Sequence, residues 1–549
     1  MLGPIFTLEL IRERRGLLWR LGPWTYAGLL ALEALVSWWA TSLTNFSGEP
    51  VLTPAVFFPS LVQQFVVQHF FVLFLLTPAL TASALGEEKA KGTLADLFTT
   101  ELTSTEIVGG KLLARSLRVA EMILPSLPIL FIVGGFSGLP PTFFAALVLV
   151  SLVVILGVGS LGLLCAVESK YTSGALLATY AMIGGSALAV RIIPLPALDP
   201  LEALTPAWRQ AAPWATAWNL GAASLAWLAV AGVCFAVAVW RLRPDGLRLM
   251  QGDGHKRDAV ALSRPPVGDD PIRWRGYHVE GLALLPLFRC VARSWGVLAA
   301  GVAATGVSTY SALQSVNYWS RYQHATPWFF MLQGSFFLIA ATLSVTARAA
   351  SAVTGERERD TWDSLRLTPL DGRTFLNGKL RGIFDSVGPY FVAYALPATI
   401  LSLTGGPLGL FVTITSLLIA WPLMYYAACC SLRASVLGRS TWRSLLAALF
   451  IVYGTSLFIC VVCHHVVGVV LFVVIESYAG FRLHLEGEVV VIVLGYCICA
   501  ISSSLALAAF GRSQMRRAEG ECLEVSAQIR RRPRSPSSGR GKTRGPACT

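Results

Sequence analysis

The sequence has little charge for its length. Asp, Glu, Lys and Arg make up 14% of 549 residues, and hydrophobic residues make up 54%. A soluble domain typically carries about 25% charged residues. Several apolar runs exceed the ~20 residues that a helix needs to cross a ~30 Å hydrocarbon core, and backbone polar groups in lipid are satisfied within helices. The composition therefore predicts an all-α, polytopic helical membrane protein.

The N-terminal segment lacks the order of a secretory signal peptide, in which basic residues precede an apolar core and a small-residue cleavage site. Its apolar residues are instead spaced ahead of Arg12, Arg14 and Arg15. This pattern is typical of an amphipathic helix that lies on the inner membrane face. The eleven cysteines are scattered and do not have the spacing of a disulfide framework.

The sequence also lacks a phosphate-binding loop of the form G-x-x-x-x-G-K-[ST]. The stretch GRTFLNGKL from Gly372 has one residue too many between its glycines, and Leu380 follows the lysine. The GGKL at 109–112 fails in the same way. We therefore expect no ATPase site, no other catalytic site, no metal and no cofactor in this chain.

Basic residues are in excess, with a formal net charge of +13. Base-rich segments alternate along the chain with loops that carry few bases, so all the base-rich segments fall on one side of the membrane. This alternation predicts a plasma (inner) membrane protein with both termini in the cytoplasm and no nucleic-acid partner. Twelve spans are expected, near 21–43, 59–85, 117–137, 142–166, 171–192, 214–240, 295–314, 326–350, 384–404, 407–431, 445–472 and 488–510.

The spans fall into two sets of six. The first module is expected at 1–241 and the second at 286–511. A linker at 242–285, rich in Gly, Pro and charge, joins them on the cytoplasmic side, and DPIRWR within it echoes GPIFTL near the N-terminus. The tail at 512–549 is basic and rich in Pro, Ser and Gly, which predicts disorder.

The two modules share residues at an offset of 268 positions. The matched pairs include Glu88 with Glu356 and Lys111 with Lys379. Further along, Gly134-Gly135 corresponds to Gly405-Gly406 at an offset of 271. We therefore predict a duplicated membrane module. An even number of spans in each copy makes the repeats parallel, related by an axis along the membrane normal.

Two charged segments stand out between the second and third spans of each module. The first charged segment is 86–112 and the second is 354–380. Acids early in each segment favour the start of a short helix, and Pro369 favours its end. Trp362 and Leu365 are expected to rest on the membrane end of the bundle. Each segment is therefore predicted to hold a short helix outside the bilayer.

Both charged segments resemble the segment after the second span of ABC-2 type (type V) ABC transporter permeases. In the first copy the match covers Glu88, Gly92, Thr93, Leu97, Thr100, Leu102, Gly110 and Lys111. In the second copy it covers Glu356, Thr361, Leu365, Thr368, Pro369, Leu370, Gly378 and Lys379. Arg357 and Glu358 are expected to contact the ATPase together with these matched residues. The sequence departs from the family at Asp360, where Gly is usual, and at Glu101, where Pro is usual.

The resemblance implies a function as well as a fold. It implies an N-terminal interfacial helix, six spans per module, and a cytoplasmic coupling helix that sits in a cleft of a separate ABC ATPase subunit. Two fused modules would use two copies of that ATPase, which would consume the ATP. The implied role is the permease of a bacterial ATP-driven exporter. The substrate stays open among lipids, peptides, drugs and glycans.

Two alternatives rest on residues inside the expected spans. Glu33, near the middle of the first span, is a candidate for a transport pathway because an acid is costly there. Paired acids in both halves would indicate an ion-coupled secondary transporter with parallel repeats. The stretch CVVCHH, Cys460 to His465, has the C-x-x-C-H form of a haem attachment site, which leaves a membrane redox protein as the third interpretation.

Overall fold

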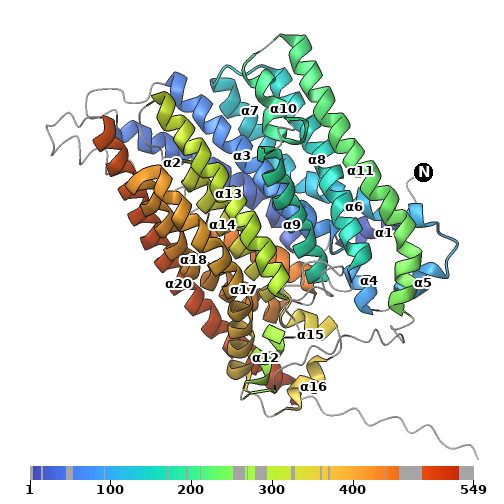
Figure 1. Cartoon of the computed structure of the whole chain (residues 1–549). Helices are drawn as coiled ribbons and strands as arrows, with labels where there is room; N and C mark the ends of the chain where they lie inside the picture. The colour runs from blue at the N-terminus through green and yellow to red at the C-terminus, as the bar shows by residue number, and fades with distance from the viewer. Residues whose placement is uncertain are drawn as a thin grey trace, which may run out of the picture.

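The structure is a computed structural model, drawn in Figure 1. It describes residues 4–13, 17–44, 54–91, 93–169, 172–192, 196–210, 212–250, 266–268, 270–278, 293–322, 328–358, 361–368, 371–438, 440–456 and 485–530.

The first half of the chain folds into eleven described helices. They are α1 (Pro4–Glu13), α2 (Leu17–Thr44), α3 (Pro54–Thr81), α4 (Gly86–Lys91), α5 (Leu94–Phe98), α6 (Ser104–Ile123), α7 (Leu127–Phe136), α8 (Pro141–Glu168), α9 (Thr172–Ile192), α10 (Pro200–Trp208) and α11 (Pro213–Met250). Short 3-10 turns join α6 to α7 and precede α10.

The second half repeats this order. It contains α12 (Pro271–His278), α13 (Arg293–Tyr322), α14 (Trp328–Ala350), α15 (Thr354–Glu358), α16 (Trp362–Arg366), α17 (Gly372–Ser402), α18 (Gly406–Leu437), a helix over 441–456, and α20 (Leu485–Arg530). The described residues form no strand.

Seven described segments are long and apolar enough to cross a membrane. They are Phe58–Thr81, Ser104–Phe136, Pro141–Glu168, Pro213–Pro244, Gly296–Asn317, Trp328–Ala350 and Gly372–Leu437. The fold is therefore that of an all-α, multi-pass membrane protein, as the composition predicted. The last segment holds two of the expected spans, because α17 and α18 are joined only by a 3-10 turn.

The remaining expected spans have different outcomes. Those near 21–43, 171–192 and 488–510 are helical within α2, α9 and α20, but they are not among the seven. The span expected near 445–472 is helical up to 456, and the rest lies outside the described residues. The count of twelve spans stays a prediction.

The backbone repeats at the offset of 268 residues. α4, α5 and α6 begin at Gly86, Leu94 and Ser104, and α15, α16 and α17 begin 268 residues later. The two described glycines with positive φ, Gly138 at 72° and Gly406 at 70°, follow the same offset. The backbone therefore matches Gly138 with Gly406, in place of the pairing at offset 271 that the sequence suggested.

The two halves pack through equivalent helices. α9 of the first half contacts α14 of the second. In the reciprocal position, the helix over 441–456 packs on the first half, where Leu445 and Leu449 belong to its hydrophobic core and Tyr453 lies 5.9 Å from Phe71 between ring centroids. Because α3 corresponds to α14, this reciprocity is what a two-fold relation between the halves produces.

The short helices gather at one end of the bundle. Figure 1 shows α4, α15, α16 and α12 towards the lower end, with α5 beside the lower end of α11 and α10 at the opposite end, and α4 contacts α15 directly. Along α11, exposed Trp214 and Trp218 lie near one end and exposed Trp240 lies towards the other. Tryptophans at both ends of a span are typical of the two membrane–water interfaces.

The linker and tail are more helical than the sequence suggested. α11 continues to Met250 and α12 occupies the end of the linker.

The predicted disorder from residue 512 is wrong as far as Arg530, because α20 continues to that residue. The helix is held there since Met515, Ala518 and Cys522 are buried in the second core, and Glu521 pairs with Arg433 at 2.9 Å. Residues 531–549 lie outside the described residues.

Candidate functional site

Each charged segment is folded as two short helices between long ones. In the first segment, α6 starts with a capping box in which the Thr103 backbone N–H donates to Glu106 at 2.8 Å and the Glu106 backbone N–H donates to the Thr103 hydroxyl at 3.3 Å. This reciprocal cap satisfies two helix-end donors. It therefore fixes where the exposed segment ends and the long helix begins.

An ion pair anchors the first segment to the long helix. Lys111 of α6, with 1% of its surface exposed, places its ammonium 2.6 Å from Glu88 of α4. The same ammonium lies 2.9 Å from Glu9 of α1, and Glu9 also pairs with Arg115 at 3.0 Å. Lys111 donates in addition to the Ala84 carbonyl at 3.1 Å. One buried lysine thus joins α1, α4 and the end of α3 to α6.

The equivalent ion pair is present in the second segment. Lys379 of α17 lies 3.0 Å from Glu356 of α15, and both side chains are buried. Glu356 also accepts from the Thr361 hydroxyl at 2.6 Å and pairs with Arg275 of α12 at 3.1 Å. Burial raises the pKa of Glu356, but Lys379, Thr361 and Arg275 together outweigh burial and hold it below the usual value.

The surrounding charges differ between the two copies. In the first copy a lysine lies between two acids, Glu9 and Glu88. In the second copy an acid lies between two bases, Arg275 and Lys379. Buried ions need compensating partners, and each copy supplies them through its own interfacial helix, α1 or α12. The two buried ion-pair clusters therefore occupy equivalent positions, but a lysine is central in the first and a glutamate in the second.

A glycine next to each anchoring lysine seats the interfacial helix. A Cβ on Gly110 would lie 3.2 Å from the Cβ of Ile5 in α1. A Cβ on Gly378 would lie 2.9 Å from the Cβ of Ile272 in α12. The distance at Gly378 is too short for a side chain unless α12 shifts, and the distance at Gly110 is tight. The G-K pair of each segment therefore combines a close helix contact with the buried ion pair.

A basic residue ties each short helix to the end of a further long helix. Lys89 donates to the carbonyls of Ala166, Val167 and Ser169 at 2.7, 2.6 and 3.0 Å, at the end of α8. At the offset of 268, Arg357 donates to the Gly438 carbonyl at 2.7 Å, at the end of α18. Carbonyls at a helix C-terminus lack helical partners and carry partial negative charge. A cation there donates hydrogen bonds to the unpaired carbonyls and offsets their partial negative charge.

The tips of the segments are more accessible than their anchors. Thr93, Thr100 and Thr368 are exposed, and Leu367 is 89% exposed, an unusual value for a leucine. Leu97 and Leu102 are half-buried against the first core, and Leu365 is half-buried against the second. Each segment therefore has buried anchoring residues and a tip that faces away from the bundle.

The residues singled out in the sequence thus have different places in the structure: some anchor the charged segments, some lie at the exposed tips, and some lie outside the described residues. Glu88, Gly110 and Lys111 are anchoring residues, as are Glu356, Gly378 and Lys379. Two further predicted residues also anchor the segment: Arg357, and Glu358, which accepts from the backbone N–H of Thr441 at 2.6 Å. Gly92, Pro369 and Leu370 lie outside the described residues.

Sequence reasoning missed several members of the site. Glu9, Lys89, Arg115 and Arg275 were not singled out. Lys89 could have been found, because Arg357 is its basic counterpart at the offset of 268. The repeat did not reveal Glu9 or Arg275, because these two residues are not matched with each other at the offset of 268.

Glu33 lies in a polar cluster between α2 and α3. It is 1% exposed, and its Oε1 accepts from Gln64 at 2.5 Å. Neither its Oε2 nor the amide of the buried Gln68 has a hydrogen-bond partner among the described residues. His69, also on α3, places its Nε2 2.9 Å from the hydroxyl of Ser151 on α8. The acid is restricted to the first half, because the position equivalent to Glu33 is Gly301.

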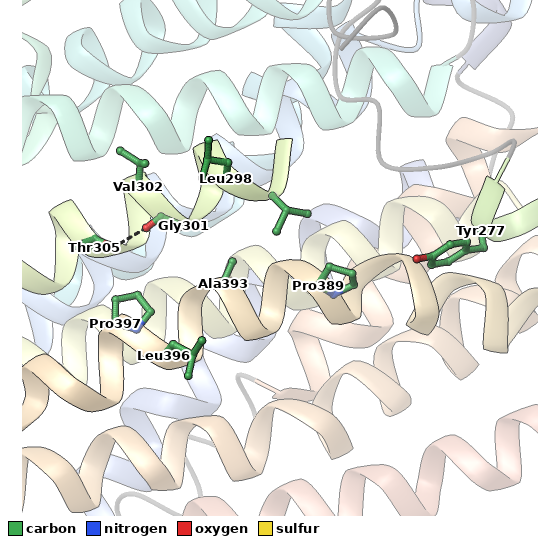
Figure 2. Close-up of a pocket in the computed structure, with 10 residues that line it drawn as sticks. Tyr277, Leu298, Gly301, Val302, Thr305, Pro389, Ala393, Leu396 and Pro397 are labelled. Atoms are coloured by element: carbon green, nitrogen blue, oxygen red, sulfur yellow. Dashed lines mark hydrogen bonds between the residues drawn. The ribbon is translucent and has the colours of Figure 1, made fainter. Parts of the chain in front are cut away.

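An apolar groove lies in the second half, between α13 and α17. It has a volume of about 810 Å³. Figure 2 shows it between α13, which contributes Leu298, Gly301 and Val302, and α17, which contributes Pro389 and Leu396, with Tyr277 of α12 at one end. The groove is lined mainly by apolar atoms, with the Tyr277 phenol and the Thr305 hydroxyl as its polar side-chain groups.

The haem-like stretch Cys460 to His465 lies outside the described residues. Among those described, no group of three or more His, Cys, Asp or Glu side chains is arranged to hold a metal ion.

In comparisons with known proteins, no family model and no curated protein matches the chain.

Proposed function

We propose that the chain is the membrane-spanning permease subunit of an ATP-driven ABC exporter, and that separate ATPase subunits drive it through the two charged segments. The observation that carries this proposal is the matched anchoring of two short helical segments, each with an exposed tip, at one end of the bundle. Each is attached by an acid to the start of the third long helix of its half, and by a base to the end of the fourth. The sequence resemblance assigns these segments to ATPase contact.

The anchoring suits force transmission. A displaced tip cannot swing freely, because the buried ion pair and the base at the helix end would have to break first. Breaking one partner of a buried pair costs about 3–5 kcal/mol. A push on the tip therefore moves the long helices with it. For net work, the ATPase must bind one arrangement of the halves more tightly than the other.

The test is purification of the native complex after mild solubilisation. An ATP-hydrolysing subunit should copurify, and Leu367→Asp should lower its recovery and its ATP turnover, because an exposed leucine at the tip becomes charged. Arg209→Asp is the matched control, since Arg209 is exposed at the opposite end of the bundle, beside α10. A complex without any ATPase, or equal losses from both variants, would contradict the proposal.

The buried Glu33 favours a second candidate, an ion-coupled secondary transporter. Intramembrane acids mark ion pathways in many transporters. The position is occupied by Gly301 in the second half, whereas parallel repeats that share an ion site would be expected to match. We therefore rank this candidate second, and propose a pathway role for Glu33 within the ATP-driven cycle.

A further inference from the structure

A second groove lies between α17, α18 and α20, and its lining combines two arginines with apolar walls. The groove has a volume of about 520 Å³, within the range of small-molecule sites. α17 contributes Arg381 and Phe384, α18 contributes Trp421, and α20 contributes Ala508 and Arg512. The rings of Phe384 and Trp421 stack with centroids 5.7 Å apart.

The two arginines are exposed and available. Arg381 and Arg512 are both exposed, and neither guanidinium forms a hydrogen bond or ion pair with a described residue. Asp385 also lines the groove, but its carboxylate is bound by Arg273 of α12 at 2.5 and 3.2 Å. The free charge of the groove is therefore positive.

The sequence places these arginines at a membrane boundary. Arg512 is the first charged residue after an uncharged run at 489–511, and Asp385, four residues after Arg381, is the last before an uncharged run at 386–432. Both runs are long enough to enter a hydrocarbon core. The arginines therefore lie at headgroup level on the end of the bundle that carries the charged segments, and the apolar walls extend from them into the hydrocarbon.

We propose that this groove binds an anionic phospholipid of that leaflet, with its phosphate between Arg381 and Arg512 and an acyl chain along Phe384, Trp421 and Ala508. Guanidinium groups pair with phosphate through planar, bidentate hydrogen bonds. Basic pockets between membrane helices on the cytoplasmic side are suited to anionic headgroups. A zwitterionic lipid lacks the net charge that two unpaired arginines require.

The test uses the delipidated full chain in a neutral detergent, titrated with phosphatidylglycerol or phosphatidylcholine and followed by native mass spectrometry. Phosphatidylglycerol should bind more tightly, and each of Arg381→Ala and Arg512→Ala should weaken it about fivefold. The double variant Arg381→Ala/Arg512→Ala should weaken binding further than either single change. The double variant Arg516→Ala/Arg517→Ala removes the same charge outside the groove, and should bind as the wild type does. Equal losses in both double variants would reduce the effect to general surface charge and overturn the site.

Two further arms separate a lipid from other anions. Ala508→Phe fills the apolar part of the groove and leaves both arginines in place, so lipid binding should fall while thermal stability in neutral detergent is kept. Unchanged lipid binding would show that no acyl chain lies there. Inorganic phosphate at millimolar concentration should not displace the lipid; displacement would identify a soluble phosphate site and overturn the proposal.

Discussion

Lys379 lies 3.0 Å from Glu356, a residue 23 positions earlier in the chain, and both side chains are buried. In the first half, Lys111 and Glu88 form the same contact at 2.6 Å. The acid comes from a short helix at the end of the bundle and the lysine from the long helix that follows. Each pair therefore fixes an exposed tip to a helix that crosses the molecule.

We expect Glu356→Gln to destabilise the second charged segment by about 3–5 kcal/mol, because Lys379 is then left buried with its main counter-charge removed. Hydrogen exchange of the amides in α15 and α16 measures the change. Replacing both partners, Glu356→Met with Lys379→Met, should cost less than the single change. Arg373→Ala, which removes an exposed ion pair with Glu519 at 3.8 Å, should change the free energy by less than about 1 kcal/mol. A single variant as mild as this control would contradict the anchoring role.

The anchor should also depend on pH. The pKa of Glu356 is held below its usual value by Lys379, Thr361 and Arg275 against the opposing effect of burial. Its stabilising contribution is therefore complete above the usual carboxyl pKa, and is lost as the pH falls through the lowered value in the folded state. Hydrogen exchange of α15 should accelerate in that acidic range. In Glu356→Gln the acid-induced acceleration should be reduced, and an unchanged pH profile would exclude this carboxylate as its source.

The glycine beside the lysine gives a steric prediction. Gly378→Ala should displace α12 from α17, because the new methyl would lie 2.9 Å from Ile272. The displacement should appear as faster proteolysis or hydrogen exchange of α12. Gly388→Ala in the same helix meets no atom within 4 Å other than those of its chain neighbours, so it should leave α12 protected. Equal protection of α12 in both variants would refute the close contact.

Much of this site could be predicted from the sequence because the repeat was visible in it. Glu88, Lys111 and their counterparts emerged as matched positions, and the helix starts follow the same offset of 268. Their burial could not be predicted, because a charged stretch between apolar runs is normally solvated. The partners Glu9 and Arg275 come from interfacial helices that are distant in sequence and opposite in charge, so only the packing of α1 on α6 and of α12 on α17 reveals them.

The tail was predicted less well, for a physical reason. Its composition is basic and polar, which favours disorder, but Met515, Ala518 and Cys522 recur at helical spacing and reach the second core. Arg433 on α18 supplies a counter-charge for Glu521. Tertiary packing thus continues the helix past the point at which composition alone would end it.

Glu33 separates the two candidate functions. If ATP drives the protein, Glu33→Gln should keep ATP turnover of the complex within about twofold of the wild type, because the amide retains the size of the side chain and Glu33 lies apart from the charged segments. An ion-coupled transporter would instead lose ion-dependent transport with this single change. The measurements are ATP hydrolysis by the purified complex and ion-gradient-driven uptake in vesicles. Loss of ion-driven uptake with no ATPase present would favour the second candidate.

The position of the two tips on the membrane tests the central claim most directly. In a cysteine-free background, Thr99→Cys and Leu367→Cys would be labelled in intact cells and in inside-out vesicles with a membrane-impermeant maleimide, with Arg209→Cys as the marker of the opposite side. The account predicts that both tips react only in inside-out vesicles, and that Arg209→Cys reacts in intact cells. Tips that react from opposite sides of the membrane would contradict the account, because one set of cytoplasmic ATPases could not then reach both.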